Sequence, residues 1–362
     1  MRGRLWRETL ALLLLWACLD SAHSRSCSSF FCRKSHRVSG LNGVDPGSPL
    51  FLTPYLEKGA IDEARKLSLV GELPGANVKS YAGYLTVNKK YNSNLFFWFF
   101  PALMPSRAKA PVMLWLQGGP GGTSMFGLFV EHGPYVVYKN LTVGMRDYAW
   151  TSRYSVLYID NPVGTGFSFT DDDRGFAQNQ DDVGRDLYSA LTQFFQIFPE
   201  YQSNDFYATG EEPEDQEYFS QFVTLPSVRR AIHVGNLTFH DGSQVEKHLL
   251  QDVMKSIKPW LGVLMDHYRV LIYSGQLDVI VAAPLTERFL PTVNWTGADE
   301  YKKAPRFHWK LQPGDTEVAG YVRQVGDFCQ VIIRGGGHIL PYDQPARSFD
   351  MIDRFLSTRG WI

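Results

Sequence analysis

Three segments of the chain carry residue types that can perform acyl transfer. A glycine-rich turn follows an apolar run at residues 115–124 (WLQGGPGGTS), Asp278 follows the run LIYSGQL, and His338 follows VIIRGGG. An acid followed along the chain by a histidine, each just past a strand, can orient an imidazole that acts as a general base. The amides of a glycine-rich turn can stabilise an oxyanion. These segments predict three of the four parts of a hydrolytic site.

The fourth part, a nucleophile, is absent from its expected place. It belongs upstream of the acid, on a strained strand-to-helix turn with the pattern GxSxG. Residues 205–209 (DFYAT) predict a strand and Gly210 begins the turn, but Glu212 occupies the serine position and Pro213 follows it. Proline has no backbone N–H to donate to an oxyanion. The pattern GxSxG does not occur anywhere in the sequence. We therefore expect the site to lack its nucleophile and one oxyanion donor.

The predicted elements alternate in a way that can position these segments. Continuous apolar runs indicate buried strands at residues 111–116, 155–160, 269–273 and 330–333, and residues 81–87 and 94–100 indicate antiparallel strands before them. Helices are expected at residues 181–198, 226–234, 245–268 and 346–356, with a short helical stretch near residues 56–69. This alternation predicts the α/β class, with a mostly parallel sheet as in the α/β-hydrolase fold.

The middle of the chain is too short for a complete fold of this kind. Only 65 residues separate Glu212 from Asp278, and the one strand candidate between them, residues 222–225, ends at Pro226. We therefore expect an α/β-hydrolase fold truncated by loss of the elbow helix, a strand and most of the cap. The predicted divisions are a signal peptide (1–24), an amino-terminal lead-in (25–75), a first half (76–211), a helical remnant of the cap (212–268) and a second half (269–362).

Taken together, five motifs resemble the serine carboxypeptidases over essentially the whole mature chain. They are WLQGGPGGTS, DNPVGTGFSF, YATGE, SGQLD and GGGHILPYDQP. The resemblance implies hydrolysis of residues from the carboxyl ends of peptides by a Ser-Asp-His triad. It assigns Asp278 as the acid, His338 as the base and Gly119 as an oxyanion donor. It also matches Gln117 and Glu211 to positions that bind the terminal carboxylate of the substrate.

Two departures from the family pattern bear on activity. The family reads GESYAG where this chain has Gly210-Glu211-Glu212-Pro213, so the serine is gone and this chain is expected to be inactive. The family's GGPGCSS is GGPGGTS here, with Gly122 in place of a cysteine. Text similar to the family resumes at Glu212, as if a central block had been removed, which an alternative transcript or a faulty gene model would produce.

Other readings of these residues have weaker support. Glu212 could act as a carboxylate nucleophile or base, but the residues that follow it do not form an elbow. The glycine-rich turn could bind phosphate, but it lacks the GxxxxGK[ST] lysine and the GxGxxG spacing. No HExxH or CxxC pair accompanies the histidines, so neither a metal site nor any other cofactor is expected.

Composition and the amino terminus indicate a secretory protein. A net charge of −1 and 44% apolar residues are typical of a globular protein and give no reason to expect nucleic acid as a partner. Residues 1–24 combine three arginines, an apolar run at 10–19 and small residues ending at Ser24, which predicts a signal peptide cleaved near that residue. The apolar run is shorter than the ~20 residues of a membrane span, so a signal anchor is the weaker alternative and no membrane anchor is expected.

Sequons and cysteines fit the same route. Asn140, Asn236 and Asn294 each begin an N-x-T tripeptide and are candidate glycosylation sites. We therefore expect a secreted or a lysosomal or endosomal location. After removal of the signal peptide, Cys27, Cys32 and Cys329 remain, an odd number in an oxidising compartment. Cys27 and Cys32 could form a disulfide bond.

Three hypotheses follow for the function. The first is a secretory or lysosomal serine carboxypeptidase by descent, a class whose substrates are the carboxyl ends of peptides and proteins, with this particular chain catalytically inactive. The second is a non-catalytic secreted glycoprotein that keeps a peptide-binding cleft. The third is an unstable splice or gene-model product, because domains are stable by only ~5 to 15 kcal/mol and loss of a buried strand and helix exceeds that margin. If Glu211 must be protonated to bind a carboxylate, binding is expected to favour acidic pH.

Overall fold

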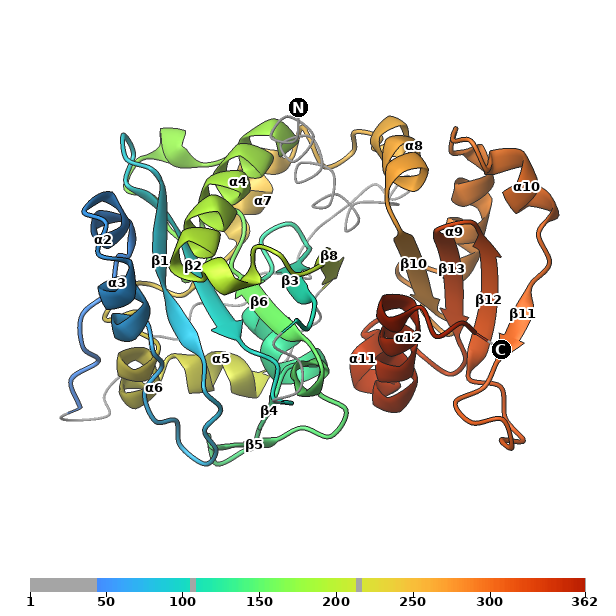
Figure 1. Cartoon of the computed structure of the whole chain (residues 1–362). Helices are drawn as coiled ribbons and strands as arrows, with labels where there is room; N and C mark the ends of the chain where they lie inside the picture. Colours follow the sequence, from blue (N-terminus) through green and yellow to red (C-terminus); the bar gives the residue numbers. More distant parts are fainter. Residues whose placement is uncertain (1–43, 105–108, 213–216, 362) are drawn as a thin grey trace.

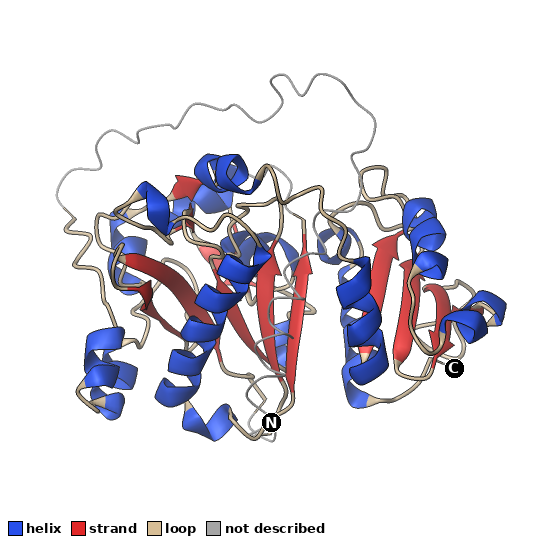
Figure 2. Cartoon of the chain, turned by 90° about the horizontal axis from the view of Figure 1, so that it is seen from above, coloured by secondary structure: helices blue, strands red, loops and turns tan. Residues whose placement is uncertain are grey.

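The computed structural model describes residues 44–104, 109–212 and 217–361 and arranges them as two β-sheets with helices on their faces (Figure 1). Seen from above, the two sheets stand side by side, each with its own helices (Figure 2). The predicted signal peptide, Cys27 and Cys32 lie outside the described residues. Within the described ranges, no helix combines the length and the apolarity that a membrane span requires.

The first sheet contains five strands in the order β1-β2-β6-β3-β8. The strands are β1 (Tyr81–Asn88), β2 (Ser93–Phe100), β6 (Ser155–Ile159), β3 (Val112–Gln117) and β8 (Phe206–Glu211). The pairs β1–β2 and β2–β6 are antiparallel, whereas β3 runs parallel to both β6 and β8. Every residue of β2, β3 and β6 is buried, as the continuous apolar runs predicted. These sequence-based strands are confirmed.

Helix α4 (Gln180–Ile197) covers one face of the first sheet. The side chain of Asn179 caps its first turn by accepting a hydrogen bond from the Asp182 amide, and its apolar stripe is buried. Within that stripe, the ring of Phe194 packs edge-on against Phe99 of β2, with 4.9 Å between centroids. The short helices α2 (Thr53–Glu57) and α3 (Ile61–Leu67) lie against α4 and replace the single helical stretch expected there.

The second sheet contains four strands in the order β10-β13-β12-β11. The strands are β10 (Val270–Gly275), β13 (Phe328–Ile333), β12 (Gly320–Val325) and β11 (Phe307–Trp309). β10 and β13 are parallel, and the other two pairs are antiparallel. The two parallel strands and helix α12 (Pro345–Ser357) were predicted from the sequence, whereas β11 and β12 were not.

The remaining elements are short. The smaller helices are α9 (Ala283–Phe289), α10 (Ala298–Lys303) and α11 (Leu340–Asp343), with single turns at Gly127–Glu131, Trp150–Ser152, Asp173–Gly175, Pro199–Tyr201 and Leu290–Thr292. A two-stranded sheet pairs β4 (Tyr135–Val137) with β5 (Val143–Met145).

The segment between the two sheets carries four helices in its described part, joined by turns and loops. It contains α5 (Glu217–Val223), α6 (Pro226–Ala231), α7 (Ser243–Leu249) and α8 (Lys258–His267). The weak strand candidate at residues 222–225 is not a strand, since residues 222–223 belong to α5. The single helix expected over residues 245–268 was wrong in detail, because it is interrupted between α7 and α8. β9 (His240–Asp241) pairs with β7 (Thr165–Gly166), outside both larger sheets.

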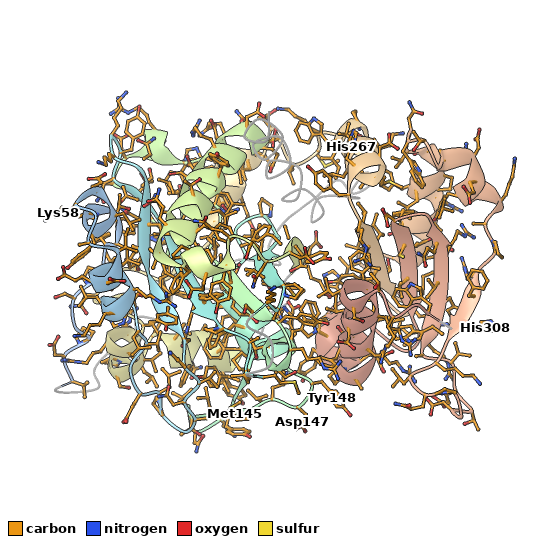
Figure 3. All side chains as sticks on the ribbon, in the orientation of Figure 1. Lys58, Met145, Asp147, Tyr148, His267 and His308 are labelled. Atoms are coloured by element: carbon orange, nitrogen blue, oxygen red, sulfur yellow. The ribbon has the colours of Figure 1, made fainter. Side chains whose placement is uncertain are left out.

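In the described residues no strand joins β8 to β10, so the single central sheet expected from the sequence is divided in two. The halves nevertheless pack together through α12. Asp353 of α12 accepts hydrogen bonds from the guanidinium of Arg153 at 2.6 Å and from the hydroxyl of Tyr154 at 2.8 Å. Beside them, the ring of Tyr148 packs against Phe349 of α12, with 6.3 Å between centroids (Figure 3).

Candidate active site

The carboxyl ends of four strands bring together most of the residues selected from the sequence. Gln117 ends β3, Glu211 ends β8, Asp278 lies three residues past β10, and His338 lies five residues past β13. Residues that are more than 200 positions apart in the chain thereby share one site at the boundary between the two sheets. The site lies where the carboxyl ends of parallel strands are expected to carry function.

Asp278 and His338 form a hydrogen-bonded pair. His338 Nδ1 lies 3.2 Å from Asp278 Oδ2. The other carboxylate oxygen, Oδ1, accepts hydrogen bonds from the amides of Ile280 at 2.8 Å and Val281 at 3.0 Å, which fixes the carboxylate. With Nδ1–H donating to the acid, Nε2 is left as the proton acceptor, the tautomer that a general base requires.

The charge of the pair is set by competing effects. Burial lowers the pKa of His338, but the hydrogen bond and the charge of Asp278 outweigh it, so the net shift of the histidine pKa is upward. Burial raises the pKa of Asp278, but hydrogen bonds from His338 and from backbone amides outweigh it, so the pKa of the acid is lowered. The pair therefore favours an ionised carboxylate that holds and stabilises an imidazolium.

Glu212 faces the other nitrogen of the histidine. Its Oε2 lies 3.7 Å from His338 Nε2, too far for a hydrogen bond but close enough for attraction between opposite charges. Burial raises the pKa of Glu212 to about 7, with the charge of His338 lowering it and that of Asp278 raising it. His338 thus faces a carboxyl group that is largely protonated below neutral pH.

The glycine-rich turn after β3 depends on backbone conformations that favour glycine. Gly119 has φ +127° and Gly121 has φ +98°. A Cβ on Gly121 would lie 2.8 Å from the carbonyl oxygen of Gly242, so a larger residue is excluded there. The amide of Gly119 makes no hydrogen bond with any residue that the structure describes. That amide is therefore available to an oxyanion or to solvent.

Asp160 anchors this turn, a role that was not predicted from the sequence. It is fully buried, and its Oδ1 accepts hydrogen bonds from the hydroxyl of Thr123 at 2.6 Å and the amide of Ser124 at 3.0 Å. Its Oδ2 accepts from the amide of Phe167 at 2.8 Å. Burial raises the pKa of Asp160 to about 6, and these donors oppose that shift.

Gln117 belongs to a buried cluster with two acids. Its side-chain amide donates to Glu131 Oε1 and to the main-chain oxygen of Glu211, both at 2.8 Å. Its Oε1 accepts from the indole of Trp115 at 2.9 Å. Glu131 was missed in the sequence because it lies in the apolar stretch MFGLFVEHG; a charged residue in a buried run was the available signal.

The two acids of this cluster resist simultaneous ionisation. Glu211 accepts hydrogen bonds from the hydroxyl of Tyr273 and the amide of Leu340, both at 2.8 Å, yet burial raises its pKa to about 7. Burial and the nearby charge of Glu211 raise the pKa of Glu131 well above its usual range, and its Oε2 has no hydrogen-bond partner among the described residues. The cluster therefore holds at least one proton at neutral pH.

Other candidate residues lie away from this site. His308 is on the outermost strand β11, and His267 ends α8 (Figure 3). The three asparagines of the sequons, Asn140, Asn236 and Asn294, are all exposed. Cys329 is buried and unpaired, and burial raises the pKa of its thiol to about 11.

Comparisons with known proteins agree on one family. The serine carboxypeptidase family profile matches residues 71–212 and 211–358 of this chain. A probable serine carboxypeptidase of Homo sapiens, CPVL, is 47% identical, with 100% of this chain and 99% of that protein covered. The venom serine carboxypeptidase of Apis mellifera is 39% identical, with 89% and 93% covered.

The fold is shared with a solved structure. Kex1(delta)p, a prohormone-processing carboxypeptidase from Saccharomyces cerevisiae, superposes with a TM-score of 0.72 at 17% identity, covering 81% of this chain and 96% of that one. This likeness supports the α/β-hydrolase fold.

The same comparisons locate the missing block. The human alignment runs over 479 positions although this chain has 362 residues, so at least 117 positions have no residue here. The two matches to the family profile meet at residues 211–212, at the end of β8. The match on both sides of this junction covers most of the sequence, and the chain belongs to the serine carboxypeptidase family.

Proposed function

We propose that this chain is a secretory-pathway serine carboxypeptidase homologue that has lost its nucleophile and does not hydrolyse peptides. The observation that carries the proposal is the carboxylate of Glu212, 3.7 Å from the proton-accepting nitrogen of His338. Serine-type acyl transfer needs a hydroxyl at that place, which the histidine deprotonates for attack on the carbonyl carbon. A carboxyl group with a pKa of about 7 is protonated at acidic pH. In that form it is a weaker nucleophile than a serine hydroxyl activated by a histidine.

The remaining parts have defined roles in this proposal. Asp278 orients His338 and stabilises its imidazolium, and Gly119 supplies one oxyanion donor. The second donor of a nucleophile elbow is the amide that follows the nucleophile, and Pro213 has no such amide. Loss of a single oxyanion donor lowers the rate by about 10²- to 10³-fold. The Asp278–His338 pair and the glycine-rich turn are thus remnants of a catalytic site and cannot carry out acyl transfer without the nucleophile.

A fluorophosphonate probe tests this proposal directly. The purified secreted chain is incubated with the probe beside a His338→Ala variant, and in parallel with a blocked dipeptide whose terminal residue is measured by mass spectrometry. We expect neither covalent labelling nor release of the terminal residue. Labelling that disappears in the His338→Ala variant, together with trimming of the dipeptide, would overturn the proposal.

A second function, binding of peptide carboxyl ends without cleavage, has its own support. The cluster of Gln117, Glu131 and Glu211 keeps an amide and two carboxyl groups whose pKa values are raised. Protonated carboxyl groups can donate hydrogen bonds to a carboxylate, whereas ionised ones repel it. The ligand would be the terminal carboxylate of a peptide, and binding would favour pH below about 7, where Glu211 is protonated.

Calorimetry with a matched pair of ligands tests this binding. A blocked dipeptide with a free carboxylate is compared with its carboxyl amide at pH 5 and pH 8. We expect the free acid to bind at least tenfold more tightly at pH 5 than at pH 8, and the amide to show no such change. Equal affinities for the acid and the amide at pH 5 would refute a carboxylate-binding role.

The proposed location is the secretory pathway, with release or delivery to lysosomes or endosomes. It rests on the signal-like residues 1–24 and on the exposed positions of Asn140, Asn236 and Asn294. Expression in a eukaryotic secretory host followed by peptide N-glycosidase treatment should lower the apparent mass in up to three steps. A protein retained in the cytosol without glycans would contradict this assignment.

A further inference from the structure

Each sheet ends in an edge strand at the boundary between them, paired on one side only within the described residues. β8 is the last strand of the first sheet and β10 the first strand of the second, and no hydrogen bond joins their backbones in the described residues (Figure 1). Natural edge strands are usually protected by proline, lysine, a bulge or a covering element. Neither β8 (FYATGE) nor β10 (VLIYSG) contains a proline or a lysine. Both edges are therefore competent to accept another strand.

The outward groups of β8 follow from its pairing with β3. The amide of Gly118 donates to the carbonyl of Glu211, so the odd-numbered residues of β8 direct their backbone groups toward β3. Because these groups alternate along a parallel strand, Ala208 and Gly210 direct theirs away from the sheet. No described residue bonds to the amide or carbonyl of Ala208 or Gly210.

The same reasoning applies to β10. The amide of Gln276 donates to the carbonyl of Ile333, so the even-numbered residues of β10 face β13. Leu271 and Tyr273 therefore direct their amides and carbonyls toward the boundary, where the described residues offer them no backbone partner.

Long side chains cross the boundary at both ends of the strands. Tyr273 donates to Glu211 Oε2 at 2.8 Å near the carboxyl ends. Arg269 donates from Nη1 to the hydroxyl of Tyr207 at 3.3 Å near the amino ends. β8 and β10 thus run in the same direction, linked by side chains and not by main chain. One inserted strand needs roughly 10 Å between the flanking backbones, twice the usual strand spacing.

On one face of the sheets a single hydrophobic cluster spans the boundary between β8 and β10, and on the other face the packing is in two separate clusters. On the face with the single cluster, Phe355 of α12 packs against the ring of Tyr207, with 6.2 Å between centroids, and against the guanidinium of Arg269, 4.6 Å from its ring centre. Tyr207, Leu271 and Tyr273 pack in one continuous hydrophobic cluster there. On the opposite face, β8 and β10 pack in two separate clusters. One face of an inserted strand would pack on this continuous cluster, and its other face would lie between the two separate clusters.

We propose that β8 and β10 together bind one extended, uncharged peptide segment of another polypeptide, which inserts as a shared strand and joins the two sheets. The chain lacks residues at this place that its relatives possess, since the family matches meet at the end of β8. The groups left exposed are backbone donors and acceptors on both sides, which select an extended main chain. Exposed Leu277, Val279 and Ile280 after β10 favour an apolar partner over a charged one. The proposal holds whether or not the neighbouring site is active.

The first experiment uses a fluorescein-labelled, carboxyl-amidated decapeptide that alternates valine and threonine and contains no charged residue. Its control is the same peptide with alternate backbone nitrogens methylated, which removes the amide donors along one edge. Fluorescence anisotropy with the wild-type chain should rise to saturation, and N-methylation should raise Kd at least tenfold. Absence of saturable binding, or equal binding of both peptides, would overturn the proposal.

The second experiment alters the edge itself. Ala208→Pro removes an outward amide without removing a hydrogen bond to β3, and Ala208→Ser is the matched control that keeps this amide. We expect Ala208→Pro to raise Kd at least tenfold and Ala208→Ser to change it less than twofold, with circular dichroism reporting that both variants are folded. If Ala208→Pro fails to fold, the comparison of the methylated and unmethylated peptides on the wild-type chain still tests the proposal. A wild-type dimer that dissociates in Ala208→Pro would show that a second copy occupies the edge, and would refute a peptide partner.

Discussion

The hydroxyl of Tyr273 donates a hydrogen bond to Glu211 across the boundary between the two sheets, with 2.8 Å between the oxygens. Glu211 is the last residue of β8, and Tyr273 lies within β10. Burial raises the pKa of Glu211 to about 7, while this hydrogen bond and one from the Leu340 amide lower it. The tyrosine thus stabilises the ionised acid and links two sheets whose described strands share no backbone hydrogen bond.

Tyr273→Phe should therefore destabilise the protein in a pH-dependent manner. The lost hydrogen bond to a charged group is worth about 1.5–3 kcal/mol when Glu211 is ionised, and less when it is protonated. We expect the free energy of unfolding in urea to fall more at pH 8 than at pH 5. Tyr342→Phe is the control, because Tyr342 is 55% exposed. Equal losses at both pH values would show that the hydrogen bond does not favour the ionised form.

Glu212→Gln tests the raised pKa of the residue at the nucleophile position. The pKa of Glu212 is about 7 in the folded chain, against a usual value of 4.5. A folded-state pKa above the unfolded value contributes stability at low pH that is lost as pH rises, here between about 4.5 and 7. Glutamine does not titrate, so the variant should gain up to about 3 kcal/mol of stability relative to wild type across that interval, at ~1.4 kcal/mol per pKa unit. Urea unfolding of both proteins from pH 4 to pH 8 measures the difference.

A second measurement, on the neighbouring histidine, checks the same prediction. If the stability difference is flat with pH, Glu212 does not experience the burial that raises its pKa. Proton NMR of His338 supplies an independent reading: the charge of Glu212 raises the histidine pKa, so it should fall in the glutamine variant.

Asp353→Ala should weaken the contact between the halves. Asp353 is buried and accepts hydrogen bonds from Arg153 and Tyr154 of the first half. Removing one partner of a buried charged pair leaves the other without compensation and costs about 2–4 kcal/mol here, allowing for partial exposure of Arg153. Thermal unfolding should show a lower midpoint, and Asp299→Ala, at an exposed site, should leave it unchanged. Two separate transitions in wild type would mean that the halves do not unfold together.

Some strands could be predicted because their sequences allow few alternatives. The run VMLWLQ of β3 is apolar on both faces, which suits a central parallel strand. β12 was missed because Arg323 and Gln324 interrupt its apolar pattern. The break between α7 and α8 had a readable signal, since Pro259 lies in the first turn of α8. The sequence predicted that a strand is missing, but not that the sheet is divided in two, because sequence patterns do not show how the remaining strands pair.

The site divides in a similar way. Asp278 and His338 follow strands in a chain order that only a few catalytic folds use, so their pairing could be predicted. The partners of Glu131 and Asp160 could not be predicted, because they are amides and side chains that meet only after folding. Roles that depend on sequence order are visible in the chain; roles that depend on burial appear in the folded structure.

Restoring a hydroxyl provides the last prediction. Glu212→Ser places a serine beside the His338–Asp278 pair but leaves Pro213, which has no amide, as the next residue. We expect slow fluorophosphonate labelling that disappears when His338→Ala is added. Combining Glu212→Ser with Pro213→Ala restores the N–H group and should raise the labelling rate by about 10²- to 10³-fold, the usual effect of one oxyanion donor. Equal rates with and without the proline would mean that this amide does not reach the oxyanion, and that loss of the nucleophile alone accounts for the proposed inactivity.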